Sequence, residues 1–409
     1  MRDTDFYERV LGLDAPWRVG RVELNVQDKR VDIHLTHDPG VTWACPHCGE
    51  ALSCYDHVQQ RTWRHLDTCQ FQTLVHARLP RVKCPEHGVV QVDASWAAPR
   101  SRFTLLFERW VIDVIRECST VSGACKLLGI GWDQAFGVMK RAVERGRARK
   151  GDKPVTHLGV DEKAFRKGHS YMTVVCDLEE GTVEHVAEDR RAESLGEYFE
   201  SLTDEQLAGI EAVAMDMWQP YVKATMAHVP LAGEKIVFDR FHIVKQLNDA
   251  VDRVRRQENK ALRREGDDTL ARTRHLWLYG REHVPAKRSD RFDLLKAMNL
   301  KTARAWAIKE TLRDLWDYRS PAWARKHFDR WFGWARRCKL EPIKKTALTL
   351  KRHLDNILTY FKHPITNGVA EGLNSKIMSI KRKARGHRNK ENFKTAIYFF
   401  CGGLDLYPQ

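Results

Sequence analysis

The clearest pattern in the chain is a set of short apolar runs that each lead directly to an aspartate. Three such runs lie between residues 158 and 239, and they deliver Asp161, Asp216 and Asp239. Short apolar runs bounded by polar or turn residues are typical of buried strands. The pattern therefore predicts that strands of one sheet carry three carboxylates out of an apolar core.

The elements around these aspartates follow an order that predicts a mixed sheet. The strand ending at Asp161 leads into a charged turn over residues 162–169. The later predicted elements are a strand over 171–176, a strand over 183–187, a helix over 195–202, a strand ending at Asp216, a helix over 221–228 and a strand ending at Asp239. Three strands followed by helix, strand, helix and strand is the order of a ribonuclease-H-like fold, here within a multidomain α/β protein. In such a sheet the first and fourth strands are neighbours, so Asp161 and Asp216 can meet at one edge.

The strand pattern then disappears over a long segment rich in arginine, lysine and tryptophan. We expect residues 154–242 to form the first part of the core and residues 243–362 to form an all-helical insertion. Most tryptophans of the insertion should pack in its core, although one could stack on an unpaired base. They are Trp277, Trp306, Trp316, Trp323, Trp331 and Trp334.

A helix is expected to resume at residues 364–374, within a second core segment over residues 363–409, and it carries Glu371. A dense cationic run follows this glutamate along the same helix. A charge run is usually a solvated face, but its place beside a carboxylate favours contact with DNA phosphates. The candidate contacts are Lys376, Lys381, Arg382, Lys383, Arg385 and Arg388.

Two short motifs in the N-terminal domain, residues 1–100, have the same form. CPHCG begins at Cys45 and CPEHG begins at Cys84, so Cys48 of the first motif corresponds to His87 of the second. Proline stiffens each turn, and glycine permits the left-handed geometry that directs two ligands at one ion. Three cysteines and one histidine form a closed structural zinc set, expected within residues 41–92.

Nearby residues leave the fourth zinc ligand open, because Cys54, His57, His65 or Cys69 could replace His87. The long gap between the two motifs is expected to hold a hairpin over residues 73–82. Ahead of the motifs, we expect a helix over residues 6–13 and a hairpin with strands over 22–26 and 31–35.

Residues 101–153 read as a DNA-binding domain followed by a basic linker. An amphipathic helix is expected over residues 103–118, and two further helices are expected on either side of Gly129 and Gly131. This is the pattern of a helix-turn-helix, although an ordinary helical hairpin gives the same signal. In the first reading, the second helix presents to the major groove the side chains of Asp133, Gln134, Lys140 and Arg141.

Composition supports a polyanionic partner. The net charge is +15 and the isoelectric point is near 9.4, which favours nucleic acid. No apolar run approaches the ~18 residues of a membrane span, and the acidic N-terminus is unlike a signal peptide. We therefore expect an intracellular protein of the cytoplasm, associated with the nucleoid. Four cysteines lie singly in apolar segments, as reduced core thiols do, and they are Cys118, Cys125, Cys176 and Cys401.

Carboxylates on buried strands, together with a glutamate beside a cationic run, predict a magnesium site that acts on phosphodiesters. Two Mg²⁺ or Mn²⁺ ions about 4 Å apart can activate a nucleophile and stabilise both the phosphoryl group and the leaving oxygen. Hard divalent ions prefer carboxylate oxygens. Asp161, on the first and central strand, is the natural residue to bridge the two ions.

Four segments resemble those of bacterial insertion-sequence transposases of the ISL3 family, which belong to the DDE superfamily. They are GVDEKAFRKGHSY, VAMDMWQPY, VFDRFHIVKQLNDAV and NGVAEGLNSKIMSIKRKARGHRN. The resemblance covers nearly the whole chain and includes the layout of zinc module, helix-turn-helix, split core and insertion. It implies that Asp161, Asp216 and Glu371 are the catalytic residues. Asp239 matches a recurrent family aspartate and is either an accessory metal group or a structural one.

The activity implied by this resemblance is DNA transposition. The protein would bind the terminal inverted repeats of its element, cut one strand at each end with Mg²⁺, and join the freed 3′-hydroxyl to target DNA. Joining two ends implies at least a homodimer. Two alternatives stay open, namely a sequence-specific DNA-binding regulator with an inactive nuclease fold, and a different two-metal nuclease.

Overall fold

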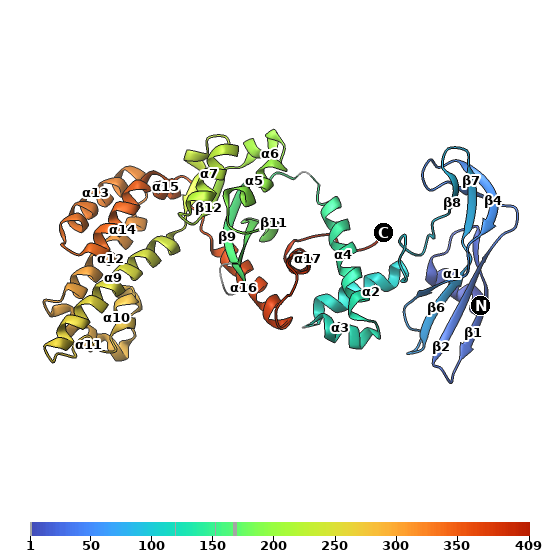
Figure 1. Cartoon of the computed structure of the whole chain (residues 1–409), viewed down its shortest axis with the longest axis horizontal. Helices are drawn as coiled ribbons and strands as arrows, with labels where there is room; N and C mark the ends of the chain where they lie inside the picture. Colours follow the sequence, from blue (N-terminus) through green and yellow to red (C-terminus); the bar gives the residue numbers. More distant parts are fainter. Residues whose placement is uncertain (1, 119, 152, 167–169) are drawn as a thin grey trace. The chain divides into compact units, whose positions relative to one another are not determined.

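The computed structural model of the chain describes residues 2–118, 120–151, 153–166 and 170–409. They form two compact units (Figure 1). The first unit joins Met1–Gly151 to Ile380–Gln409, and the second comprises Asp152–Ser379. The expected last segment, 363–409, is therefore divided between the two units. Within the described residues, no helix is long and apolar enough to cross a membrane.

The N-terminal domain of the first unit contains two four-stranded sheets. The first has the order β1-β2-β6-β5, comprises β1 (Trp17–Asn25), β2 (Arg30–His37), β5 (Arg61–Arg64) and β6 (Gln72–Ala77), and is preceded by α1 (Asp3–Leu11). The second has the order β3-β4-β7-β8 and comprises β3 (Thr42–Ala44), β4 (Ala51–His57), β7 (Pro80–Cys84) and β8 (Gly88–Gln91). Trp17, Trp63 and Trp96 pack edge to face in the buried core.

The predicted hairpin over residues 22–35 is confirmed, because β1 and β2 pair antiparallel. The hairpin predicted over residues 73–82 is wrong. β6 pairs with β2 and β5, whereas β7 pairs with β4 and β8. The chain therefore changes sheets between Ala77 and Pro80, and the zinc motifs come to lie on a sheet of their own.

Four helices complete the first unit, namely α2 (Leu105–Glu117), α3 (Val121–Leu128), α4 (Trp132–Arg149) and α17 (Lys390–Cys401). Thr120 caps α3 by accepting the Gly123 N–H at 2.9 Å, and Gly129 ends it in the left-handed conformation at φ 64°. The helix-turn-helix geometry is therefore the expected one. The basic segment after residue 144 was expected to be a linker, but it is helical as far as Arg149.

The second unit is built on a five-stranded mixed sheet with the order β11-β10-β9-β12-β13. Its strands are β9 (His157–Arg166), β10 (Ser170–Asp177), β11 (Thr182–Glu188), β12 (Ala212–Met215) and β13 (Ile236–Phe238). The helices between strands are α5 (Ala192–Glu200), α6 (Asp204–Gly209), α7 (Gln219–His228) and α8 (Ala232–Lys235). β9 is central and pairs antiparallel with β10 and parallel with β12, as predicted.

The sheet corrects one prediction about the first aspartate. Asp161 does not end a short strand but lies in the middle of β9, opposite Val174 of β10. The segment predicted as a charged turn continues the strand as far as Arg166, and residues 167–169 lie outside the described residues. Charged side chains can alternate along a strand whose one face is open to solvent, so charge alone did not mark a turn.

Helices are the regular elements of the predicted insertion, and turns and loops connect them. The insertion comprises α9 (Arg240–Arg264), α10 (Arg274–Leu278), η1 (Arg281–His283), α11 (Ala286–Ala297), α12 (Lys301–Arg313), η2 (Asp314–Asp317), α13 (Pro321–Arg337), α14 (Glu341–Arg352), α15 (Leu354–Leu358) and η3 (Thr359–Phe361). Trp277, Trp306, Trp316 and Trp331 are buried in this domain. Trp323 and Trp334 are exposed. The chain then enters α16 (Gly368–Lys383), which carries Glu371 in its first turn.

Candidate functional site

The two zinc motifs sit at equivalent places in the second sheet of the N-terminal domain. Cys45 follows β3, and Cys84 ends β7, so each motif forms the tip of a hairpin. Gly49 and Gly88 follow the second ligand of each motif at φ 76° and 69°. Only glycine adopts this conformation at low cost, which explains why both turns need it.

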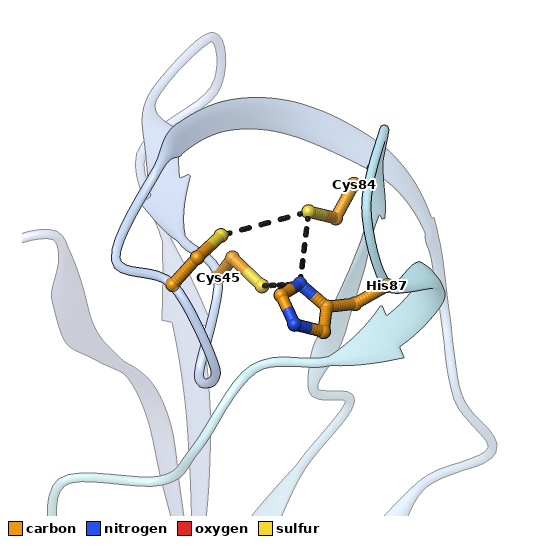
Figure 2. A group of neighbouring side chains, drawn as sticks. Cys45, Cys84 and His87 are labelled. Atoms are coloured by element: carbon orange, nitrogen blue, oxygen red, sulfur yellow. Dashed lines mark hydrogen bonds between the residues drawn. The ribbon is translucent and has the colours of Figure 1, made fainter.

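The four predicted ligands of this sheet converge on one point. Figure 2 shows Cys45, Cys84 and His87 facing one another. All four ligand atoms, including the sulfur of Cys48, lie within 4.8 Å of one another. The sulfurs of Cys48 and Cys84 are 3.6 Å apart, and the Nδ1 of His87 is 3.4 Å from the sulfur of Cys84.

These separations fit one tetrahedral zinc ion. Zn–S bonds of about 2.3 Å and Zn–N bonds of about 2.0 Å place two sulfurs about 3.8 Å apart and a sulfur and a nitrogen about 3.5 Å apart. Among the alternative ligands, His65 is buried away from the cluster and contacts Thr104, while Cys54 lies beside His57. The set is closed, with four protein ligands, and therefore suits a structural ion rather than a catalytic one.

The second candidate centre lies on the sheet of the second unit. Asp161 is on β9, Asp216 directly follows β12 and Asp239 directly follows β13. These three strands are adjacent and parallel, so the two later aspartates emerge from the same end of neighbouring strands. The hydrogen bond from the Asp239 N–H to the Met215 carbonyl, 3.0 Å long, ties the two strand ends together.

A histidine stands among these carboxylates. His242, in the first turn of α9, approaches Asp216 with 3.1 Å between its Nδ1 and the Oδ2 of the aspartate. The hydrogen bond to Asp216 raises the pKa of His242 above its ordinary value, and the charges of Asp216, Asp239 and Asp161 act in the same direction. One imidazole thus contacts Asp216, and the charges of all three strand aspartates favour its protonated form.

Asp216 and Asp239 have different surroundings. Burial tends to raise the pKa of Asp216, but the hydrogen bond and charge of His242 outweigh it, so this pKa lies below its ordinary value. The pKa of Asp239 is raised by burial and by the charge of Asp161. Asp239 is only 5% exposed, and its Oδ2 has no hydrogen-bond partner among the described residues. A buried carboxylate oxygen without a partner is what a bound cation would satisfy.

Helix α16 completes the centre. Asn374 donates a hydrogen bond from its Nδ2 to the Oδ2 of Asp161. Glu371 lies three residues earlier, and residues at this spacing are neighbours on one side of a helix. The Glu371 side chain is exposed. Lys163 adds a positive charge, with its Nζ 3.7 Å from the Oδ2 of Asp161.

The carboxylate oxygens of this centre lie on neighbouring elements, but they do not converge on a single point. Within the described part of the chain, only the cysteine and histidine set has three or more ligand atoms that all lie within 4.8 Å of one another. Carboxylates repel one another unless a cation lies between them. The three strand carboxylates, and Glu371 on the helix that is hydrogen-bonded to Asp161, nevertheless form a donor set that suits a hard divalent ion, which prefers oxygen ligands.

The predicted DNA-contacting residues of α4 differ in how far their side chains are held by other residues of the protein. Gln134 accepts the Gly131 N–H at 2.8 Å and so stabilises the start of its own helix. Arg141 binds Glu108, a buried carboxylate that also contacts Arg145. Lys140 has a side chain that is 65% exposed, and its ion pair with Glu144 is long at 3.9 Å. Lys140 is therefore exposed and only weakly held by a neighbouring side chain.

The predicted cationic run begins on α16 and continues past its end. Lys376 is exposed and belongs to the second unit, whereas residues from 380 onward belong to the first unit. Arg382 and Lys383 are exposed in the last turn of the helix, and Arg385 follows at φ 54°. Lys381 and Arg388 complete the predicted set.

Sequence reasoning named the acidic residues of the centre but missed His242 and Asn374. A usable signal existed for both. His242 lies three residues after Asp239 at the start of a helix, and Asn374 lies three residues after Glu371. Helical spacing would have placed each beside a carboxylate of interest.

Comparison with known proteins matches three parts of the chain to transposase families. Residues 158–397 match a family model described as a transposase of the ISL3 DDE type. Residues 42–87 match a model described as the zinc-finger of transposase IS204/IS1001/IS1096/IS1165. Residues 92–143 match a model described as the helix-turn-helix domain of transposase family ISL3. The transposase for insertion sequence element IS1001 of Bordetella parapertussis is 29% identical over 85% of this chain and 86% of its own length. The transposase for insertion sequence element IS1557 of Mycobacterium tuberculosis H37Rv is 27% identical over 96% of this chain and 94% of its own length.

Proposed function

Because the chain belongs to the ISL3 family of transposases, we propose that it binds the terminal inverted repeats of its insertion sequence and transfers their 3′ ends to target DNA. Asp161, Asp216 and Glu371 are the proposed catalytic residues, on a ribonuclease-H-like core. The sheet order, with an antiparallel set followed by two strands parallel to the central one, supports this proposal. Asp239 is the proposed accessory group.

One observation carries the assignment of the site. His242 lies 3.1 Å from Asp216, the charges of Asp239 and Asp161 also raise the pKa of His242, and the helix bearing Glu371 is hydrogen-bonded to Asp161. Structural ion pairs rarely bring several carboxylates together on adjacent strands, because their mutual repulsion is costly. A site that holds cations supplies the compensation.

The proposed residues have distinct roles. Asp161 would hold two divalent ions, while Asp216 and Glu371 would hold one each. When bound, such ions supply Lewis acidity toward the phosphate and lower the pKa of water. In the first reaction, water attacks the phosphodiester at the element end, and the bond to the 3′ oxygen breaks, leaving a 3′-hydroxyl and a 5′-phosphate. In the second, that hydroxyl attacks a target phosphodiester and releases the target's own 3′ oxygen, so no phosphodiester is lost.

The proposed DNA contacts are distributed over both units. The zinc domain and the helix-turn-helix bind the element end, with Lys140 facing the major groove. Gln134 and Arg141 would reach the groove only by releasing the Gly131 N–H and Glu108. The cationic run from Lys376 to Arg388 contacts further phosphates. Binding of this kind weakens steeply with salt, because each neutralised phosphate releases counterions. Two ends must be joined, so the active species is at least a homodimer on DNA.

The test is Mg²⁺-dependent nicking of supercoiled donor DNA that carries the element ends. Asp161→Ala and Glu371→Ala should lose nicking and strand transfer by at least about a thousandfold while keeping wild-type affinity for the ends. Glu341→Ala is a matched control, because Glu341 also lies exposed in the first turn of a helix, α14, of the insertion. If Asp161→Ala or Glu371→Ala still nicks with Mg²⁺, the assignment of the site is wrong.

A further inference from the structure

Asn374 has the environment of a functional residue rather than of a surface amide. It lies on α16 and is 4% exposed. Its Nδ2 donates to the Oδ2 of Asp161, whose other oxygen accepts the Glu162 N–H at 2.7 Å. Both oxygens of Asp161 are therefore held in one orientation by donors from two different elements.

The orientation of the Asn374 amide follows from the charge of Asp161. An ionised carboxylate offers only acceptors, so it selects the NH₂ end of the amide and rejects the carbonyl end. The Oδ1 of Asn374 is buried and has no hydrogen-bond partner among the described residues. A buried amide oxygen left without a partner is costly, so Asn374 is not explained by local stability alone.

The same contact sets the rotation of the helix that bears Glu371. Asn374 and Glu371 are three residues apart and therefore project from one side of α16. Near the start of this helix, the Nδ2 of Asn367 donates to the Val160 carbonyl of β9 at 3.5 Å. The helix is thus fixed against the central strand at two points, on either side of the glutamate.

An uncharged donor also suits the electrostatics of this place. Lys163 already places a positive charge 3.7 Å from the Oδ2 of Asp161, and a second cationic side chain in the position of Asn374 would compete further with a metal ion for this carboxylate. An amide holds the carboxylate by a hydrogen bond without adding charge. One hydrogen bond occupies only part of the acceptor capacity of an oxygen, so Asp161 can still accept a cation.

We propose that Asn374 is a positioning residue for cation binding, which fixes the Asp161 carboxylate and orients α16 so that Glu371 faces the same ions. This inference rests on the proposed function of the carboxylate centre. It concerns how the ligands are held, and Asn374 itself need not touch DNA or the reacting phosphate. Groups that orient metal ligands typically change metal affinity by about 10- to 100-fold when they are removed.

The experiment uses the full chain, loaded with zinc, and two substitutions. Asn374→Ala removes the amide, and Asn374→Leu removes it while keeping a side chain of similar size. Mn²⁺ binding is measured by electron paramagnetic resonance without DNA, and the Mg²⁺ concentration for half-maximal nicking is measured on donor DNA. Both variants should raise both midpoints by about 10-fold or more, and nicking should recover at high Mg²⁺. Zinc content and affinity for element ends should stay unchanged.

Asn259→Ala is the matched control, because Asn259 lies on α9, and its Oδ1 is also buried without a partner. It should leave both midpoints at wild-type values. Wild-type midpoints in Asn374→Leu would overturn the inference, as would a loss of nicking that excess Mg²⁺ does not relieve. Asp161→Ala shows whether such a result contradicts only the role of Asn374 or the whole carboxylate site. If Asp161→Ala is inactive while both Asn374 variants have normal midpoints, only the role of Asn374 is wrong.

Discussion

Acidification should destabilise the first unit through a single histidine, His65. This residue is 2% exposed, and its Nδ1 is 2.9 Å from the Oγ1 of Thr104, which caps α2. Burial lowers the pKa of His65 from 6.5 to about 4, and the neighbouring charge of Arg64 adds to the effect. The side chain therefore joins the zinc domain to the helix-turn-helix domain in its neutral form.

The magnitude follows from the difference between the folded and unfolded pKa values. Between pH 6.5 and about 4, the unfolded chain binds a proton that the folded chain does not, so stability falls as the pH falls through this window. Above pH 6.5 both states are neutral, and the effect vanishes. With 1.36 kcal/mol per pKa unit, the loss at pH 4 is about 3 kcal/mol.

The assay is urea unfolding followed by tryptophan fluorescence, since Trp63 and Trp96 are buried in the same domain. His65→Gln retains a hydrogen-bonding side chain but does not titrate. Zinc ligands also take up protons in acid, and this effect is common to both proteins. The wild type should therefore lose about 3 kcal/mol more than His65→Gln between pH 7 and pH 4. Equal losses in the two proteins would refute the assigned environment of His65.

Three further predictions follow from buried contacts. Cys84→Ser removes one of the four zinc ligands. Metal analysis should find about one zinc per chain in the wild type and almost none in the variant, and the zinc domain of the variant should lose cooperative unfolding. Retention of zinc by the variant would contradict the ligand set. Glu108→Gln leaves Arg141 and Arg145 beside a buried neutral group, so urea unfolding should show a loss of about 3–5 kcal/mol, and a loss below about 1 kcal/mol would mean that the ion pairs are not formed. Gly159 lies on the central strand, and Gly159→Ala would place a methyl group 2.7–2.9 Å from three neighbouring side chains. This substitution should lower the free energy of unfolding by about 1–3 kcal/mol. An unchanged unfolding midpoint would show that the strand and α16 are more loosely packed.

Local pattern was sufficient for much of this protein. The zinc motifs repeat one short form, so their four ligands could be paired from the sequence, and the alternation of apolar runs and helices gave the order of the mixed sheet. The glycines at 129 and 131 marked the turn of the helix-turn-helix. These features depend on residues close together in the chain, where spacing alone fixes geometry.

Other features depended on contacts that no local pattern encodes. The segment before residue 167 is charged enough to resemble a turn, yet it is the outer half of the central strand, because β10 supplies its hydrogen-bond partners. The run from 73 to 82 resembles a hairpin, yet its halves join different sheets. Strand pairing is a tertiary choice, since a strand accepts any partner that satisfies its backbone and buries its apolar face.

The sequence by itself determined which residue types would act, namely cysteines and a histidine in two repeated turns and acids at the ends of apolar runs. The tertiary structure alone decided how those acids are held, with His242 among three aspartates and Asn374 bonded to Asp161. The physical reason is that ligand identity is a property of each side chain, whereas the charge balance and orientation of a carboxylate depend on whatever the fold brings beside it.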